Sequence, residues 1–515
     1  MAISLAGNPA HAAGELRIAN AGEPETLDPH HVTETWENRI VGDMFMGLTT
    51  EAADGSVIAG AAEGWQASDD GLVYTFKLRD HSWSDGVPVT AGDFLFAFRR
   101  ILDPATAAEY APLLYTIRNA KAINEGTIED MDALGVQALD AKTLKITLES
   151  PTPYFLEQLT HYTAFPVPKH KVEELGDDWV KPGKIVGNGP YTVVEWVPKD
   201  HVRSVRNPAF YDADNVSIDS VTFYPAEDRS AATKRFLAGE IDIQYDFASD
   251  QIDWLKENLP RETRIAPYLG VYYYAINTRK APFDDRGVRQ ALALAIDREA
   301  ITDKILRTGE RPAYGFVPPG TDAYGEPAHV DWKDTPYPDR LIKAQDLLAA
   351  AGFGPERPLR LTLRYNTSDT QKKVAIAVAA MWKQLGIQTE LFNSEVKTHY
   401  KDMQEGNFQV ARAAWLADYN DAQNFLDLMD SESGVLNYAG YGNPEYDRLM
   451  AEASKTADPK ARTQLLHQAE AIAMTDMPNI PIFYYVSKDL VASSVKGWID
   501  NSKDIHRTRF LRVER

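Results

Sequence analysis

Three strand-like stretches in the second half of the chain decide the predicted fold: LRLTLRYN (359–366), IQTELF (387–392) and FQVARAAWL (408–416). Between the first two, apolar residues recur at i, i+3, i+4, i+7, i+8 and i+11 from Val374 to Leu385, which is the period of an amphipathic helix. A more polar helix is expected between the second and third strands, ending at Gly406. The resulting order β-α-β-α-β predicts an α/β fold with an open parallel sheet.

Sequence signals on either side extend this prediction. Asn443-Pro444 and Asp458-Pro459 each place an N-cap residue before a proline at the first helical position, which predicts two further helices. The first third of the chain instead contains short alternating segments, VYTFKLR (73–79), LKITLES (144–150) and YTVVEWV (191–197). This pattern predicts an α+β region with antiparallel strands.

Asp418 stands directly after the apolar residues at the carboxyl end of the 408–416 strand. In open α/β sheets, ligands bind outside the carboxyl ends of the strands. The loop at 366–371 follows another carboxyl end and begins a helix, whose N-terminus favours anions. If the two strand ends are neighbours, they offer one negative and one positive group, which suits a zwitterion. For Asp418 itself, a core salt bridge, a catalytic acid and a partner for a cationic ligand all remain open.

Length and charge narrow the class of protein. A chain of 515 residues is long enough for about three domains. Its 75 acidic and 54 basic residues give a net charge of −21, which disfavours nucleic acid and anionic membranes as partners. The chain has no cysteine, so disulfides, thiol catalysis and thiolate metal sites are excluded.

The first residues indicate export. Ala10-His11-Ala12, followed by Ala13, has the A-x-A pattern of a signal-peptidase site, so we interpret residues 1–13 as the residual part of a signal peptide. A disordered leader is the alternative. No apolar run approaches the roughly 18 residues that span a membrane. We therefore expect an exported, soluble protein.

No catalytic motif is present. The sequence contains no G-x-S-x-G, H-E-x-x-H, Walker A or G-x-G-x-x-G pattern, and its 11 histidines are scattered, so neither a cofactor nor a metal is predicted. The enzymatic alternative is a hydrolase that pairs Asp418 with a nearby acid such as Asp421, without a motif to support it. The aromatic runs at 272–274 and 483–485 fit either core strands or the wall of a binding cleft.

Several stretches taken together resemble the peptide/nickel-type (family 5) extracellular solute-binding proteins of ABC importers, and the periplasmic oligopeptide-binding proteins in particular. The resemblance covers the chain from about residue 15 to its end. It rests on ETLDPHHV (25–32), AEGWQASDDGLVYTFKLRDHSWSDGVPVTAGDFLFAFRRILDP (62–104), GNGPYTVVEWV (187–197), YYYAINTRKAPFDDRGVRQALALAIDRE (272–299), NTSDTQKK (366–373), ARAAWLADYND (411–421) and IPIFYYVSKDLV (480–491).

The resemblance implies a clamshell of the periplasmic binding protein type II class, with two lobes and three domains. Domain I would combine residues 14–45, 168–270 and 487–515, domain II (the family-specific α+β insertion) would span 46–167, and domain III would span 271–486. It also implies a periplasmic, monomeric protein that performs no chemistry. Such a protein captures short peptides between its lobes and delivers them to the membrane permease of the importer.

The same resemblance assigns a ligand site. In the oligopeptide binders, the Asp of a W-x-x-D-Y motif pairs with the α-ammonium of the ligand, and Trp415, Asp418 and Tyr419 match that motif. The ligand lies extended and pairs through its backbone with both lobes. The backbone partners would be Thr33, Glu34 and Thr35 on one lobe and Ala413, Ala414 and Trp415 on the other. The cleft would be lined by Tyr110, Tyr268, Tyr273 and Tyr484.

The residues expected to bind the carboxylate of the ligand depart from the family pattern. Arg412 and Arg307 match basic positions that serve ligand carboxylates, whereas Gln371 and Met403 stand where enterobacterial members carry His and Arg. Losing two cations weakens charge-assisted binding of some C-termini, so a murein peptide or another amino-terminated ligand is an alternative to ordinary oligopeptides. Nickel or haem carriage is disfavoured because no histidine cluster lies near the site. A chaperone for unfolded chains would bind long polypeptides, which an enclosed cleft excludes.

Overall fold

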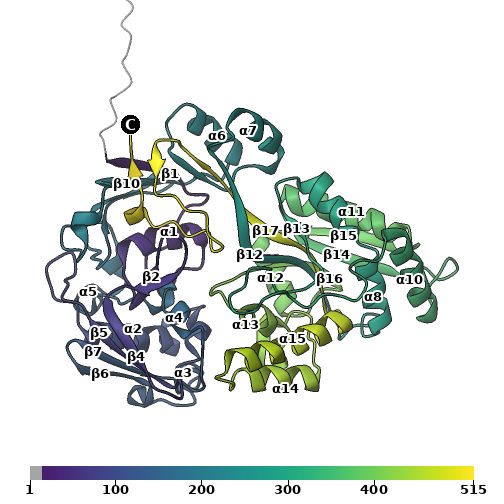
Figure 1. The fold of residues 1–515 in the computed structure, drawn as a ribbon, viewed down its shortest axis with the longest axis horizontal. Coiled ribbons are helices and arrows are strands. Elements are labelled where there is room, and N and C mark those ends of the chain that lie inside the picture. Colours follow the sequence, from purple (N-terminus) through teal and green to yellow (C-terminus); the bar gives the residue numbers. More distant parts are fainter. Residues whose placement is uncertain (1–13) are drawn as a thin grey trace, which may run out of the picture. The chain divides into compact units, whose positions relative to one another are not determined.

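The computed structural model describes residues 14–515, and the predicted leader at 1–13 lies outside the described residues. The chain divides into two compact units (Figure 1). Unit 1 comprises the chain up to Glu149, Phe155–Arg264 and Lys488–Arg515, and unit 2 comprises Ser150–Tyr154 and Ile265–Ser487. Each unit has its own hydrophobic core. The three-domain division, which would split unit 1 further, stays a prediction.

The β-α-β-α-β prediction is confirmed in unit 2. β14 (Arg360–Asn366) pairs in parallel with β15 (Gln388–Ser394) and with β16 (Val410–Leu416), and it lies between them. The connecting helices are α11 (Asp369–Lys383) and α12 (Val396–Gln404) (Figure 1). The carboxyl ends of β14 and β16 are therefore neighbours, as the ligand-site hypothesis requires.

β12 (Thr263–Ile276) makes this sheet mixed rather than purely parallel. It lies beside β16 in antiparallel register, with Gly270 opposite Leu416. Its residues 272–274 are buried, in agreement with the core-strand interpretation of this aromatic run. β17 (Asn479–Val491) follows β12 in the sheet, and the chain passes between the two units within both of these strands.

The two helices predicted from Asn-Pro and Asp-Pro are also confirmed. α14 (Pro444–Ala453) begins after Asn443, whose side chain accepts hydrogen bonds from amides of the first turn. α15 (Pro459–Asp476) begins after Asp458 in the same way. The remaining elements of unit 2 are α8 (Arg286–Leu294), α9 (Arg298–Ala300), a π-helical segment (Ile301–Leu306), β13 (Arg311–Pro312), α10 (Tyr337–Ala350) and α13 (Gln423–Leu426).

Unit 1 contains the predicted antiparallel strands. β4 (Ala62–Ala67), β5 (Val73–Leu78), β7 (Thr143–Thr147) and β6 (Val136–Asp140) form an antiparallel sheet in that order. The other elements are β1 (Glu15–Ala19), α1 (Thr35–Met44), β2 (Thr49–Glu51), β3 (Val57–Ala59), α2 (Ala91–Leu102), α3 (Ala120–Asn124), α4 (Phe155–Gln158), α5 (Lys169–Leu175), β8 (Tyr191–Val197), β9 (His201–Arg206), β10 (Ser220–Tyr224), α6 (Arg229–Leu237), β11 (Ile243–Tyr245), α7 (Ile252–Asn258), β18 (Val495–Lys496) and β19 (Arg512–Val513). Five of these strands follow the order β11-β1-β10-β9-β8. Within residues 14–515, no helix is both long enough and apolar enough to cross a membrane.

A buried carboxylate on α15 binds the segment between Phe316 and Ala328 through hydrogen bonds. Glu470 is fully buried. It accepts hydrogen bonds from three amides and one hydroxyl, those of Phe316, Val317, Ala328 and Tyr324, at 2.8, 2.9, 2.8 and 2.7 Å. The same helix carries Arg462, which reaches the loop after β16. The position of α15 therefore affects the end of the strand where ligands are expected.

Replacing Glu470 by glutamine is expected to lower the free energy of unfolding by about 2–4 kcal/mol, because the amide NH2 group of glutamine would face backbone donors in a buried site. Urea unfolding followed by tryptophan fluorescence measures the change. Glu452→Gln, on the exposed surface of α14, is the control and should shift the free energy by less than about 0.5 kcal/mol. Equal midpoints for E470Q and the wild type would show that these four hydrogen bonds contribute nothing to stability.

Candidate functional site

β16 has one edge that is paired along its whole length and one that is mostly free. β12 pairs with every residue of the strand. β14 pairs only with its first two residues, Val410 and Ala411, whereas the last two residues of β14, Tyr365 and Asn366, pair with β15 alone. Beyond Ala411, no strand within residues 14–515 occupies the second edge. The backbone at 413–415 is therefore open to an added strand, which is the geometry that the predicted backbone recognition requires.

Asp418 lies in the loop that follows this free edge. The side-chain oxygen of Asn424 accepts hydrogen bonds from the indole Nε1 of Trp415 at 2.8 Å and from the amide of Asp418 at 3.2 Å, which ties the loop to the strand end. Burial raises the pKa of Asp418 to about 7, and a hydrogen bond from Asn424 offsets only part of this effect. No cationic side chain of residues 14–515 contributes to that pKa. The structure thus contains no core salt bridge for Asp418.

Asp421, the second acid of the hydrolase alternative, is already engaged. Its two carboxylate oxygens accept hydrogen bonds from the guanidinium of Arg462 at 2.7 and 2.9 Å, and both side chains are buried. Arg462 also donates to the side chain of Gln423 at 2.8 Å. A carboxylate in a buried bidentate ion pair is held by its cation, so the hydrolase alternative loses the acid that it needs beside Asp418.

Arg412 is a buried cation held by neutral groups. Its guanidinium donates to the side-chain oxygen of Asn366 at 3.2 Å and to the hydroxyls of Tyr400 and Tyr485 at 3.2 and 2.9 Å. It also lies 5.0 Å from the ring centroid of Tyr272. Within residues 14–515 no carboxylate pairs with Arg412, which is 7% exposed, and its Nε has no hydrogen-bond partner. The positive charge is therefore positioned but not neutralised.

The other residues considered for binding the carboxylate of the ligand differ in their burial and their contacts. Gln371 lies in the first turn of α11, and its side-chain oxygen is buried without a hydrogen-bond partner. Met403 is fully buried in the core of unit 2. Arg307 is exposed, follows the π-helical segment with a φ of +64°, and is not among the contacts of Arg412.

The tyrosines predicted to line a cleft differ in their burial. Tyr273 is 1% exposed, and Tyr484 is 3% exposed with its hydroxyl donating to the carbonyl of Gly315 at 2.8 Å. For these two residues, burial in the core of unit 2 favours the core-strand interpretation over a cleft wall. Tyr268 is half-buried in β12, and Tyr110 is half-buried in unit 1.

Thr33, Glu34 and Thr35, the predicted backbone partners in unit 1, lie at the start of α1. The carboxylate of Glu37 accepts hydrogen bonds from the amides of Thr33 and Glu34 at 3.1 and 3.2 Å. These bonds satisfy amides at the helix N-terminus. The two donors are thus used by the capping box, and a ligand would have to use other backbone groups of this stretch.

Sequence reasoning missed four polar side chains that organise the β16 site, by which we mean residues 412–419 and their contacts. They are Asn366, Tyr400, Tyr485 and Asn424. Asn366 and Tyr485 fall in segments that the sequence already marks as a strand end and an aromatic run. Tyr400 and Asn424 carry no local signal, because each meets its partner only after the chain has turned back on itself.

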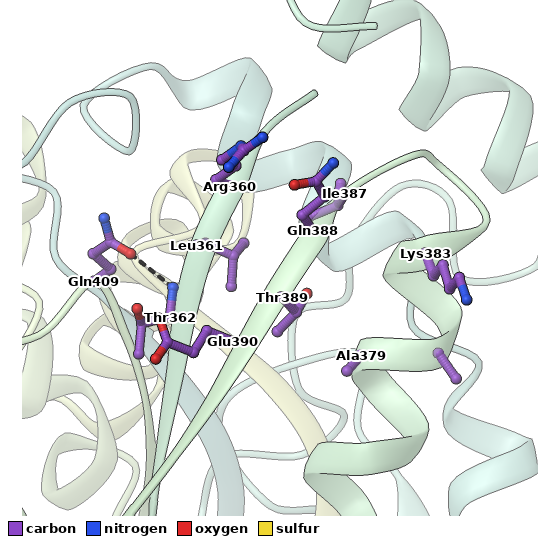
Figure 2. A pocket seen from close by; sticks show the side chains of 11 residues that line it. Arg360, Leu361, Thr362, Ala379, Lys383, Ile387, Gln388, Thr389, Glu390 and Gln409 are labelled. Atoms are coloured by element: carbon purple, nitrogen blue, oxygen red, sulfur yellow. Dashed lines mark hydrogen bonds between the residues drawn. The ribbon is translucent and has the colours of Figure 1, made fainter. Parts of the chain in front are cut away.

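A separate hollow of about 700 Å³ lies at the opposite ends of the same strands. Its lining comes from the starts of β14 and β15 and from the last turns of α11, and includes Arg360, Gln388 and Lys383 (Figure 2). Within it, the amide of Thr362 donates to the side-chain oxygen of Gln409 at 2.7 Å. The β16 site lies at the carboxyl ends of the strands, so the hollow is distinct from it.

Within residues 14–515, one group of side chains has the spacing of a metal site: Asp489, Asp504 and His506, all in unit 1. The guanidinium of Arg39 lies 3.4 Å from Asp504, so a protein cation already balances charge in this cluster. The cluster shares no residue with the β16 site, and the absence of a metal cofactor stays a prediction.

Comparison with known proteins relates these features to a family. Residues 56–437 match the model described as "Bacterial extracellular solute-binding proteins, family 5 Middle". The chain is 41% identical to the periplasmic murein peptide-binding protein MppA of Escherichia coli strain K12, over 95% of this chain and 91% of that protein. It is also 41% identical to the periplasmic oligopeptide-binding protein OppA of Salmonella typhimurium, over 93% of this chain and 88% of that protein.

The fold agrees with this relationship. The crystal structure of Haemophilus influenzae OppA in complex with RPPGFSPFR superposes with a TM-score of 0.87 at 37% identity, covering 98% of this chain and 100% of that one. The predicted fold class is therefore confirmed. The residues matched by the family model include Arg412 and Asp418. The chain belongs to family 5 of the bacterial extracellular solute-binding proteins.

Proposed function

We propose that the protein is the periplasmic solute-binding component of an ABC importer, which captures short peptides and delivers them to the permease in the inner membrane. The observation that carries this proposal is the free edge of β16 between two unpaired charges, the carboxyl group of Asp418 and the guanidinium of Arg412. Support comes from relatives named for binding murein peptides and oligopeptides.

At the amino end, the α-ammonium of the ligand would pair with Asp418, beside Trp415 and Tyr419. Asp418 is half-buried and desolvated, and no cation of residues 14–515 faces it, so an ammonium would supply the missing counter-charge and lower the raised pKa of Asp418. This role explains the desolvated carboxyl group without assigning any chemistry to it. We therefore propose a binding protein rather than an enzyme.

Between its ends, the ligand would add a strand to the free edge at 413–415, which is the β-augmentation mode of peptide recognition. The hydrogen bonds of such a ladder involve only main-chain groups. They are the same for every peptide sequence, so the proposed site tolerates many ligand side chains. Tyr110, Tyr268, Gln371, Arg307 and the remaining backbone groups of Thr33, Glu34 and Thr35 are further proposed contacts.

At the other end, Arg412 would hold the carboxylate of the ligand. Arg412 and Asp418 are six residues apart in the sequence, which is about 20 Å between Cα atoms in an extended strand. If both side chains extend towards the ligand, peptides of about three to five residues would reach both charges. A murein peptide fits the same two ends, and mass spectrometry of the ligand that co-purifies with the protein distinguishes the two classes. A single site of this kind needs one copy of the chain, so we propose a monomer.

Replacing Asp418 by asparagine is expected to weaken the binding of Ala-Ala-Ala about 100-fold, because a desolvated ammonium loses its charged partner. N-acetyl-Ala-Ala-Ala has no ammonium, so it should bind weakly to the wild type and equally weakly to D418N. Isothermal titration calorimetry of the four combinations measures both effects. Asp331→Asn, at a side chain of unit 2 that is 84% exposed, is the matched control. If D418N binds the free tripeptide as tightly as the wild type does, the ammonium contact is refuted.

The same substitution is expected to stabilise the ligand-free protein at high pH. The pKa of Asp418 is about 7 in the folded protein and about 3.9 in an unfolded chain, so the unfolded state loses its proton first as the pH rises. Asp418 therefore lowers stability progressively between about pH 4 and pH 7, and asparagine does not. Urea unfolding should show little gain for D418N at pH 4 and a gain of about 4 kcal/mol at pH 8, which is the free energy that corresponds to raising a pKa from about 3.9 to about 7. A gain of equal size at both pH values would mean that another property of the side chain is responsible.

Replacing Arg412 by methionine is expected to weaken the binding of Ala-Ala-Ala about 30-fold, because its carboxylate loses a buried cationic partner. The C-terminal amide of the same peptide has no carboxylate, so R412M should bind acid and amide alike, whereas the wild type prefers the acid. Calorimetry provides the affinities, and Arg448→Met on the exposed surface of α14 is the control. If R412M keeps the preference for the acid, the carboxylate is bound elsewhere.

A further inference from the structure

A five-residue segment of the chain belongs to a different unit from its neighbours in sequence. Residues 150–154, Ser-Pro-Thr-Pro-Tyr, are part of unit 2, whereas Glu149 and Phe155 on either side are part of unit 1. We call this segment the strap. Its two prolines fix φ at alternate positions, and the hydroxyl of Thr152 donates to the carbonyl of Ser150 at 3.0 Å. The strap is therefore stiff, and a stiff segment loses little conformational entropy when it docks.

The strap ends in Tyr154, which contacts the loop that carries Asp418. The ring of Tyr154 stacks on the ring of Tyr419, with centroids 4.5 Å apart and 10° between the ring planes. The guanidinium of Arg462 lies 5.3 Å from the ring centroid of Tyr154, and this guanidinium is the one that holds Asp421. Tyr154 thus contacts the loop directly through a stacked ring and indirectly through a buried ion pair.

The position of Tyr419 is coupled to that of Asp418. The two residues are adjacent in sequence, and Asn424 hydrogen-bonds to the amide of Asp418 and to the indole of Trp415. Tyr419 is 5% exposed, so its ring has little room to move independently of the loop. Removing the stacking partner of Tyr419 is therefore expected to change the position of the Asp418 carboxyl group, because the two residues are adjacent and belong to the same hydrogen-bonded loop.

We propose that docking of the strap and binding of the ligand are thermodynamically linked, with Tyr154 as a positioning residue that holds Tyr419 and Asp418 in place for the ligand ammonium. This inference rests on the proposed function. Linkage is reciprocal: if the docked strap raises the affinity for ligand, the bound ligand holds the strap by the same factor. The strap is joined in sequence to unit 1 at both of its ends, through Glu149 and Phe155.

Two measurements on the full-length protein test this linkage. Hydrogen exchange of the wild type with and without Ala-Ala-Ala should show slower exchange at the amides of Thr152 and Tyr154 when the peptide is bound. Stopped-flow displacement, followed by tryptophan fluorescence, should give a dissociation rate about five-fold higher for Tyr154→Ala than for the wild type, with an association rate within two-fold. Tyr154→Phe keeps the stacked ring and should restore the wild-type rate.

Tyr115→Ala is the matched control, since Tyr115 is also half-buried but bonds to Asn124 within unit 1. This variant should dissociate at the wild-type rate. Equal dissociation rates for Tyr154→Ala and the wild type overturn the proposal, and so does strap exchange that is unchanged by peptide. The exchange measurement needs no variant, so it decides the question even if Tyr154→Ala does not fold. A wild type that binds no peptide overturns the proposed function, and this inference with it.

Discussion

The unequal pairing of the two strands beside β16 is the constraint on which the candidate site depends. β12 pairs with β16 along its whole length, whereas β14 pairs only with its first two residues. β16 is thereby held in place on one side while its main-chain groups on the other side stay open. Proteins normally cover or charge such an edge, because it can pair with any other chain. Here a guanidinium at Arg412 and a carboxyl group at Asp418 flank the edge, and under the proposed function these charges would restrict it to partners with complementary ends.

Three carboxyl groups of unit 2 differ in their protein partners. Glu470 accepts four hydrogen bonds from protein groups, and Asp421 is paired with the two terminal nitrogens of a guanidinium. Within residues 14–515, the half-buried Asp418 has Asn424 as its only side-chain partner. The raised pKa of Asp418 follows from this difference, since burial is not offset by a cation. The raised pKa costs some stability at neutral pH, and the proposed ammonium of the ligand would offset this cost.

The parts of the fold that could be predicted from sequence are those with a local signal. Helical and strand periods located β14, α11, β15, α12 and β16, and Asn-Pro and Asp-Pro located the starts of α14 and α15. Tertiary context decided the rest. β12 joins the parallel strands in the opposite direction, Tyr273 and Tyr484 point into the core, and Glu37 takes the amides of Thr33 and Glu34. Asp418 was identified from its position after a strand and Arg412 from the resemblance to the family, but the neutral groups that contact them, such as Asn424 and Tyr400, were not, because those contacts form only after folding.

Arg412 and Arg462 show two different uses of a buried guanidinium group in unit 2. Both are buried guanidinium groups of unit 2, and each is held by several oxygens. For Arg462 two of those oxygens belong to a carboxylate, so its charge is neutralised within the protein and its role is to fix the loop. For Arg412 all of them are neutral, so its charge is oriented without a carboxylate partner in residues 14–515. Arg462 is engaged by Asp421, and no other cation of residues 14–515 faces Asp418, so the loop is ordered by one ion pair while the acid proposed to bind the ligand has no cationic partner there.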